Sequence, residues 1–383
     1  MVMCLCFSIF LQAQEEQKVF VQKEGKLGSQ IKDAKNVKKL TISGAKLNQK
    51  DFQALTKCTS LEYLDISGVE GIWDKIAFKS SDCQPLPQLK ELTIKYYKPT
   101  DLKSSADGYY DNIQEPYYSD LIIFNNIRDI YDQVSKLKEF APNIKQCTIK
   151  NITEPCNLSF ETPEKLIIWN KRSNGFKTAI SLQEGAAYYE AIDNDELSIN
   201  DCHLIYGVGQ ITDPKQLELK NAFYIGMQSF NIDIKKIQIK EFVIPKQIRY
   251  IDYEGFNFLN GNKEEDINII AEESDNLLRV VASGILTHGK SNKFEFNRPV
   301  YISSGAFSSS EVKQVFFNKG VEYLGKESFK EVEEIRFKEC PEKLADYIVG
   351  YPKKIQRVYV PSSSLTKFKG LGAKNIDSVI GSK

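Results

Sequence analysis

A short alternation of apolar and polar residues recurs along the chain and predicts its strands. Each copy has an apolar residue, one variable residue, a second apolar residue and a polar turn, as in KKLTISG around Leu40 and Ile42. A period of two is typical of a strand that buries one face. The pattern predicts one short strand per copy, and the copies are centred on Ile42, Ile66, Ile94, Ile149, Ile168, Ile199, Leu219, Ile239, Phe317, Phe337 and Val360.

The interval between copies indicates the class of fold. Five pairs of consecutive copies lie 20 to 24 residues apart, inside the range of leucine-rich repeats. Sandwiches place a strand about every 8 to 12 residues, so the longer interval leaves room for a second element between strands. Stacked copies bury their apolar faces against one another. The spacing therefore predicts a leucine-rich-repeat solenoid, α/β or mainly β. We expect a curved right-handed superhelix with a parallel concave sheet and an irregular or short-helical convex side.

The second half of the chain adds a more specific motif. A strand is followed by a proline or glycine turn, two apolar residues, a small residue and a phenylalanine, which is Phe256, Phe307 or Phe329. The fixed place of this ring in the repeat predicts a core residue. The stretch from Phe242 to Phe368 resembles the BspA-like leucine-rich-repeat family of bacterial surface and secreted proteins. This resemblance implies a curved solenoid with a binding or adhesive role and no catalysis.

The N-terminus has the character of an export signal. Residues 1–13, MVMCLCFSIFLQA, carry no charge, are mostly apolar and end in the small residue Ala13. An apolar segment of this length before a polar run is typical of a cleaved secretory signal and is too short to span a bilayer. The positive residues that usually precede such a segment are missing, and the alternative is a buried N-terminal strand. We predict a signal peptide and a secreted or cell-surface protein without a membrane span.

The repeat is interrupted between residues 97 and 140. We therefore expect N-terminal leucine-rich repeats at 18–96, a tyrosine-rich insertion with a helix at 129–140, and BspA-like repeats that continue the same solenoid at 141–383. Insertions in solenoids usually emerge on one face, often the binding face. Tyrosine is enriched at recognition surfaces. Two interpretations remain open, a loop pinned to the solenoid or a ligand surface, for Tyr109, Tyr110, Tyr117 and Tyr118.

Charge and cysteine content narrow the functional classes. Basic and acidic residues number 51 each, so the formal net charge is zero, which argues against a nucleic-acid partner. The 8 cysteines include no CxxC pair, so a zinc site is not expected. The six beyond the signal either form disulfides or are buried free thiols, and their scattered spacing favours free thiols at Cys58, Cys83, Cys147, Cys156, Cys202 and Cys340.

Motifs for catalysis are missing from the sequence. It has only 2 histidines, His203 and His288, and no GxSxG, P-loop or HExxH motif. We therefore expect no enzyme activity, no cofactor and no metal. A carboxylate pair for glycan cleavage would be assembled in space, so the sequence cannot display one.

One column of the repeat has an unexpected charge bias. The position after the central apolar residue carries no acidic residue in these copies, and in five it is lysine. Neighbours of a buried strand residue face the opposite side, so we expect a lysine column along the concave sheet. It either binds an anionic ligand or discourages edge pairing. The candidate binding residues are Lys95, Lys150, Trp169, Lys220, Lys240 and Lys338, together with the four insertion tyrosines.

Together these features favour an extracellular binding or adhesion protein. Its partner would be a host or environmental protein or glycan, possibly one that is anionic, held by the concave face or the inserted loop. A structural scaffold of the cell envelope is the alternative, and a glycan-processing enzyme is a more distant one. The identity of the ligand and the oligomeric state lie beyond the sequence.

Overall fold

The fold is described from a computed structural model of the 383-residue chain. The structure describes residues 15–70, 85–95, 140–150, 161, 164–170, 176–183, 186–192, 198–259, 267–281, 283–287, 290–350 and 352–382. The chain folds into two compact units. The N-terminal unit comprises Met1–Leu102, Glu115–Leu166 and Thr178–Ile192, and the C-terminal unit comprises Lys103–Gln114, Ile167–Lys177 and Asp193–Lys383.

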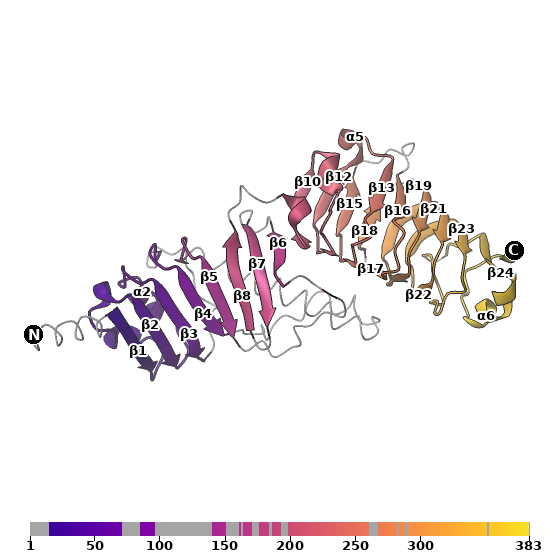
Figure 1. The fold of residues 1–383 in the computed structure, drawn as a ribbon. Helices are drawn as coiled ribbons and strands as arrows, with labels where there is room; N and C mark the ends of the chain where they lie inside the picture. Colours follow the sequence, from indigo (N-terminus) through magenta and orange to yellow (C-terminus); the bar gives the residue numbers. More distant parts are fainter. Residues whose placement is uncertain are drawn as a thin grey trace, which may run out of the picture. The chain divides into compact units, whose positions relative to one another are not determined.

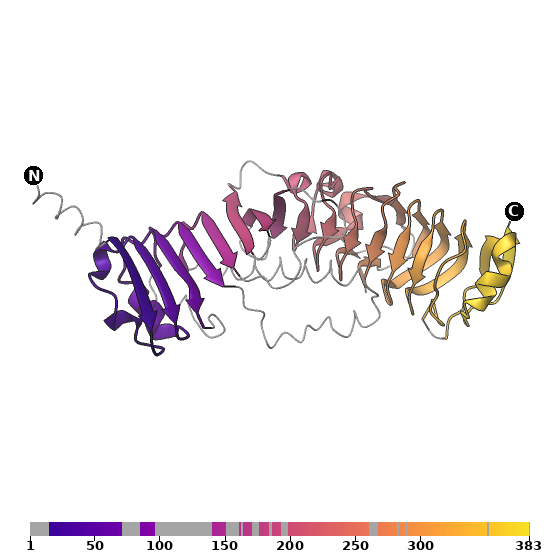
Figure 2. The same cartoon turned by 60° about the horizontal axis from the view of Figure 1, so that its bottom comes forward.

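The N-terminal unit is a sheet of repeat strands (Figures 1 and 2). Its parallel strands are β1 (Glu16–Val21), β2 (Lys39–Gly44), β3 (Tyr63–Val69), β4 (Glu91–Lys95) and β5 (Gln146–Lys150). Strand β8 (Ala186–Ile192) pairs antiparallel with β5, and β7 (Phe176–Gln183) contains the boundary between the units. The predicted strands around Ile42, Ile66, Ile94 and Ile149 are therefore confirmed.

Short helical segments connect the first of these strands. They are η1 (Leu27–Ser29), η2 (Ala34–Asn36) and α2 (Gln49–Leu55). The buried carboxylate of Asp51 ties α2 to the preceding turn, because it accepts hydrogen bonds from the backbone N–H groups of Gly25 and Leu27 at 2.7 and 2.9 Å. This alternation of strand and short helix is the expected leucine-rich-repeat arrangement.

The C-terminal unit has strands on three sides, which we call sides A, B and C (Figure 1). Side A holds β6 (Leu166–Asn170), β9 (Leu204–Tyr206), β11 (Tyr224–Ile225), β14 (Tyr250–Ile251), β17 (Leu278–Val280), β20 (Val300–Ile302) and β22 (Val321–Leu324). Side B holds β10 (Gly209–Ile211), β12 (Phe230–Asp233), β15 (Phe256–Leu259) and β18 (Ile285–Thr287). Side C holds β13 (Glu241–Ile244), β16 (Asn268–Ala271), β19 (Lys290–Phe296), β21 (Phe307–Phe317), β23 (Phe329–Phe337), β24 (Arg357–Pro361) and β25 (Val379–Ser382).

Neighbouring strands on each side are parallel wherever their pairing is described. Among the described residues of this unit, helix is confined to η4 (Ile199–Asp201), η5 (Pro214–Leu217), α5 (Ile234–Ile237), η6 (Ser362–Ser364) and α6 (Leu365–Gly370). The predicted solenoid of parallel strands is thus confirmed. The sequence did not anticipate that sides B and C would both be sheets.

Three of the strands predicted in the middle of the chain are not strands in the structure. Ile199 lies in η4, where the Asp201 carboxylate accepts hydrogen bonds from the backbone N–H and hydroxyl of Ser198 and so caps a turn of helix. Leu219 has a φ of 48°, in the left-handed region that a strand excludes. Ile239 follows Gln238, the left-handed residue that ends α5. In each place a local turn overrides the alternating pattern.

The core of the C-terminal unit is built from stacked phenylalanines. The predicted core rings of Phe256, Phe307 and Phe329 are all fully buried. The rings of Phe307 and Phe329 stack across one repeat with centroids 5.1 Å apart and planes 9° apart. A second column from side C stacks Phe317 between Phe296 and Phe337, at 5.2 and 5.1 Å. Rings in register on parallel strands thus fill the interior continuously.

The corner between sides A and B repeats one backbone conformation. Its residues have positive φ angles between 51° and 71°, and they are Gly207, Gln228, Glu254, Ser283, Gly305 and Glu327. Backbone hydrogen bonds connect this corner from turn to turn: Gln228 N–H donates to Tyr253 O and Ser283 N–H to Gly305 O, both at 2.9 Å. The left-handed turn leads the chain out of a side A strand, into a side B strand at the first four positions and into β21 or β23 at Gly305 and Glu327.

The cysteines agree with the free-thiol interpretation where they are described. Cys58, Cys147 and Cys202 are buried free thiols, and Cys340 is a partly exposed one. Cys83 and Cys156 lie outside the described residues. So do the expected signal at 1–13, the insertion tyrosines and most of the expected helix at 129–140. The division into three consecutive regions and the continuity of one solenoid remain predictions.

Candidate functional site

The expected lysine column does not run along one sheet. Lys95 and Lys150 are register partners on β4 and β5, as predicted. Lys220, Lys240 and Lys338 all lie just outside strands, in turns or bends. Trp169 is on β6 and packs partly buried against the core cluster. The five lysines therefore come from unlike positions of the repeat, because the copies at Leu219 and Ile239 are not strands.

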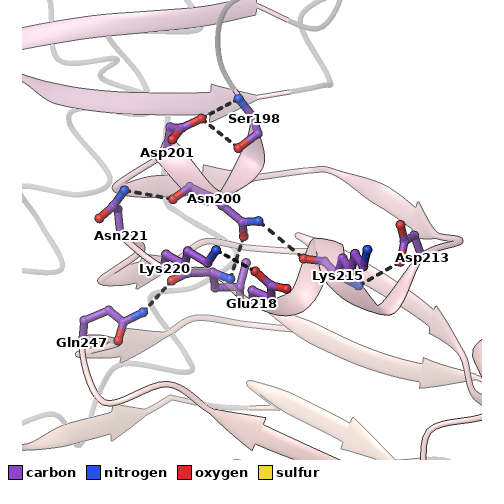
Figure 3. A network of polar contacts seen from close by, with 10 residues as sticks. Ser198, Asn200, Asp201, Asp213, Lys215, Glu218, Lys220, Asn221 and Gln247 are labelled. Atoms are coloured by element: carbon purple, nitrogen blue, oxygen red, sulfur yellow. Dashed lines mark hydrogen bonds and ion pairs between the residues drawn. The ribbon is translucent and has the colours of Figure 1, made fainter.

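Asn200 and Lys220 belong to a polar network that shapes a turn (Figure 3). The Asn200 side-chain oxygen accepts a hydrogen bond from Leu219 N–H at 2.9 Å, and the Lys220 ammonium lies 3.0 Å from the Glu218 carboxylate. The Gln247 amide donates to the Leu219 carbonyl at 2.7 Å. These contacts hold successive turns together, and Glu218 already offsets the charge of Lys220.

Side A carries a column of tyrosines that is buried. The column consists of register partners on consecutive strands, Tyr224, Tyr250, Arg279 and Tyr301. These residues alternate along their strands with core residues such as Ile225. Their exposed fractions are between 0% and 9%, and the Tyr224 hydroxyl donates to the Asp252 carboxylate at 2.6 Å. A column this buried offers no surface for a large partner.

A shallow polar cavity lies at the first turns of the corner between sides A and B. Its volume is about 340 Å³, and Gly207, Gly209, Gln228, Asn231 and Glu254 line it. The Gln228 amide donates to the Glu254 carboxylate at 3.0 Å. This lining provides one carboxylate, which already accepts a hydrogen bond from Gln228.

His203 has a structural environment. Its Nδ1 accepts a hydrogen bond from Ile167 N–H at 3.0 Å, and its ring lies 5.9 Å from that of Phe223. Burial lowers the pKa of the imidazole below its ordinary value. Among the residues that the structure describes, no group of three potential metal ligands occurs. The described helices include none with the length and apolar content to cross a membrane.

The outer face of side C carries exposed and half-buried aromatic and charged side chains. The inward residues Val315, Ile335 and Val358 join the core, so their neighbours on each strand face outward. In register on β21, β23 and β24 these outward residues are Phe316, Arg336 and Tyr359. We call the surface formed by Phe316, Glu334, Arg336, Arg357 and Tyr359 the Arg–aromatic face.

Arg336 stands between two aromatic rings on this face. Its guanidinium carbon lies 4.4 Å from the centroid of the Tyr359 ring and 5.9 Å from that of Phe316. A guanidinium within about 6 Å of an aromatic centroid is attracted by the ring quadrupole. The two contacts orient the long Arg336 side chain on the outer face of the sheet. Of this side chain, 48% remains exposed.

Glu334 positions both arginines. One carboxylate oxygen accepts from Arg336 Nε at 2.6 Å, and the other accepts from Arg357 Nε at 3.2 Å. Gln314 donates to the same carboxylate at 3.4 Å. Only 5% of the Glu334 side chain is exposed, against 47% for Arg357. The buried acid thus fixes two exposed guanidinium groups on neighbouring strands.

The residues of this face lie inside the repeat motifs, but none of them was among the predicted binding residues. Phe316, Arg336 and Tyr359 are the variable middle residues of VFF, IRF and VYV. The predicted binding column used only the residue after the second apolar position, such as Lys338. An aromatic, a basic and an aromatic residue at the middle position of three consecutive copies was the available signal.

The comparisons with known proteins identify the repeat. Residues 224–347 and 300–370 match the family model for the BspA type leucine-rich repeat region, in 6 copies. This match includes the whole of β21, β23 and β24 and therefore all five residues of the Arg–aromatic face. No curated protein matches the chain.

Proposed function

Because residues 224–370 of this chain form a BspA-type leucine-rich repeat region, we propose that it is an extracellular binding or adhesion protein without catalytic activity. It engages its partner through the Arg–aromatic face. Leucine-rich repeat regions of this type are common in bacterial surface proteins, and such regions usually mediate protein binding. The signal-like residues 1–13 support export.

The observation that carries the proposal is the Phe316–Arg336–Tyr359 row, in which the exposed Arg336 guanidinium lies against two half-buried aromatic rings. Tryptophan, tyrosine and arginine are enriched among the residues that dominate the binding energy of protein interfaces. Aromatic rings offer large contact areas at a low cost in conformational entropy. Here the side chains are held in place before any partner arrives, by ring contacts and by Glu334. Sheet residues also provide a stiffer platform than a loop.

The proposal is tested with arrays of extracellular proteins and glycans. The purified chain is compared with a Phe316→Ser, Tyr359→Ser variant, whose far-UV circular dichroism verifies folding. We expect array signals that the double substitution removes. Signals of equal strength for both proteins would move the binding site elsewhere, and an array without any signal would favour the scaffold alternative. N-terminal sequencing of the chain recovered from the culture medium tests export, and a chain that still starts at Met1 would contradict it.

A further inference from the structure

The Arg–aromatic face carries a surplus of positive charge that its own contacts leave available. Arg336 and Arg357 share the single carboxylate of Glu334, which they contact through Nε. Within the described part of the chain, the terminal Nη nitrogens of both arginines donate no hydrogen bond. These nitrogens belong to half-exposed side chains. Each arginine thus presents donors to solvent while its orientation is already fixed.

The spacing of these donors suits a pair of carboxylates. Arg336 and Arg357 belong to adjacent parallel strands, which lie about 4.8 Å apart. A planar guanidinium binds carboxylates with well-directed hydrogen bonds, which are about twice as strong as those between neutral groups. Glu334 keeps the two guanidinium groups from repelling each other in the absence of a partner. The arrangement fits an anionic group better than a neutral one.

The surroundings of the arginines distinguish a protein from a polysaccharide. Beside Tyr359 in register lies Ile380 on β25, whose exposed fraction of 37% is high for a large apolar residue. Phe316 continues the apolar surface on the other side of Arg336. Apolar and aromatic side chains around arginine are the composition of protein interface centres. An anionic polysaccharide would leave Ile380 without an apolar contact.

We propose that the partner is an acidic segment of another protein. Its carboxylates bind the Nη groups of Arg336 and Arg357, and its apolar side chains pack on Phe316, Tyr359 and Ile380. This assignment rests on the proposed function and specifies the chemistry of the partner at the same face. It also assigns the anion-binding role to these two arginines instead of the lysine column expected from the sequence.

The test uses a fluorescent copolymer of glutamate and tyrosine as the probe, with the full chain and fluorescence anisotropy as the readout. Arg336→Gln, Arg357→Gln should weaken binding at least about tenfold, because each charge-assisted hydrogen bond contributes about a factor of ten or more. The matched control, Lys330→Gln, Lys374→Gln, removes the same charge from lysines that pair with Glu311 and Asp346. It should weaken binding less than about threefold, the effect of a lost surface charge.

A second variant keeps the test decisive if the glutamine variant unfolds with Glu334 left unpaired. Arg336→Lys, Arg357→Lys keeps the charge but loses the planar fork, and we expect binding to weaken severalfold. Equal binding by the unchanged chain and all variants would overturn the proposal. Equal weakening in the Arg336→Gln, Arg357→Gln variant and in the control at Lys330 and Lys374 would also overturn it. So would binding of heparin or polygalacturonate in preference to the copolymer. Array partners that are lost in the Phe316, Tyr359 variant but kept in both arginine variants would overturn only this inference and leave the proposed function standing.

Discussion

Phe316 and Phe317 are consecutive residues of β21 that face opposite sides of the sheet, so they form a matched pair for testing the register of side C. Phe317 is 1% exposed and stacks between Phe296 and Phe337. Phe316 is half-buried on the Arg–aromatic face and contacts Arg336. Replacing each phenylalanine by alanine removes the same atoms from two different environments.

The expected costs differ severalfold. Removing a fully buried phenylalanine ring costs about 3 to 5 kcal/mol, from lost transfer free energy and the cavity left behind. Two stacked pairs are lost with Phe317, each worth about 0.5 to 1.5 kcal/mol beyond its buried area, which places this variant in the upper part of that range. Phe316→Ala loses an exposed cation–π contact of about 0.5 to 1 kcal/mol and part of its buried area. We expect the two free energies of unfolding to differ by at least about 2 kcal/mol.

Urea denaturation followed by far-UV circular dichroism measures the difference. The free-energy change is the shift in midpoint multiplied by the slope m, provided that m is the same in both variants. Equal midpoints, or a lower midpoint for Phe316→Ala, would refute the reasoning. A lower midpoint for Phe316→Ala would mean that β21 pairs one residue out of register, since such a shift exchanges every inward and outward side chain. Equal midpoints would mean that the two rings are buried to a similar extent.

Two further predictions concern titration and thiol chemistry. Burial lowers the folded-state pKa of His203 from its ordinary 6.5, so the native state binds fewer protons than the unfolded state. The free energy of unfolding should therefore fall as pH drops below about 6.5 and level off below the lowered pKa. A pH series of thermal melts should show a smaller loss for His203→Asn, whose side-chain oxygen can replace Nδ1 as the acceptor. Burial raises the pKa of the Cys58 thiol to about 11 and that of Cys147 to about 12. Among the four cysteines that the structure describes, iodoacetamide at neutral pH should therefore label partly exposed Cys340 first, as peptide mass spectrometry would show, and early labelling of Cys58 or Cys147 would contradict this burial.

The strands that the sequence predicted correctly are those in which local pattern and packing agree. Phe317, Phe337 and Val360 follow the alternating motif, and each lies on a side C strand whose inward residues join one core. Ile199 and Ile239 carry the same motif, but a capped turn and the end of α5 determine their conformation. Alternation over three residues is too short to outweigh such local hydrogen bonding.

The candidate site was harder to predict than the fold. That Arg336 contacts Tyr359 depends on the register between strands whose separation along the chain varies from repeat to repeat. Phe316 and Arg336 lie 20 residues apart and Arg336 and Tyr359 lie 23 apart, so the contact cannot be deduced from a constant repeat length. Charge bias at one repeat position indicated lysines instead, and the structure places Lys220 beside Glu218 in a turn. Which motif residues share one surface can be determined only when the pairing of the neighbouring strands is known.

The left-handed corner has a consequence for how such a chain can change over evolutionary time. Its turn-to-turn hydrogen bonds join backbone atoms, as between Gln228 N–H and Tyr253 O. They therefore do not depend on which side chain occupies the position. Glycine, glutamine, glutamate and serine all occur there. A duplicated or deleted turn therefore finds matching donors and acceptors on either side. Unequal recombination can therefore lengthen or shorten the array by whole turns, because the new neighbours form the same backbone hydrogen bonds. The outward residues of each turn can then diverge independently.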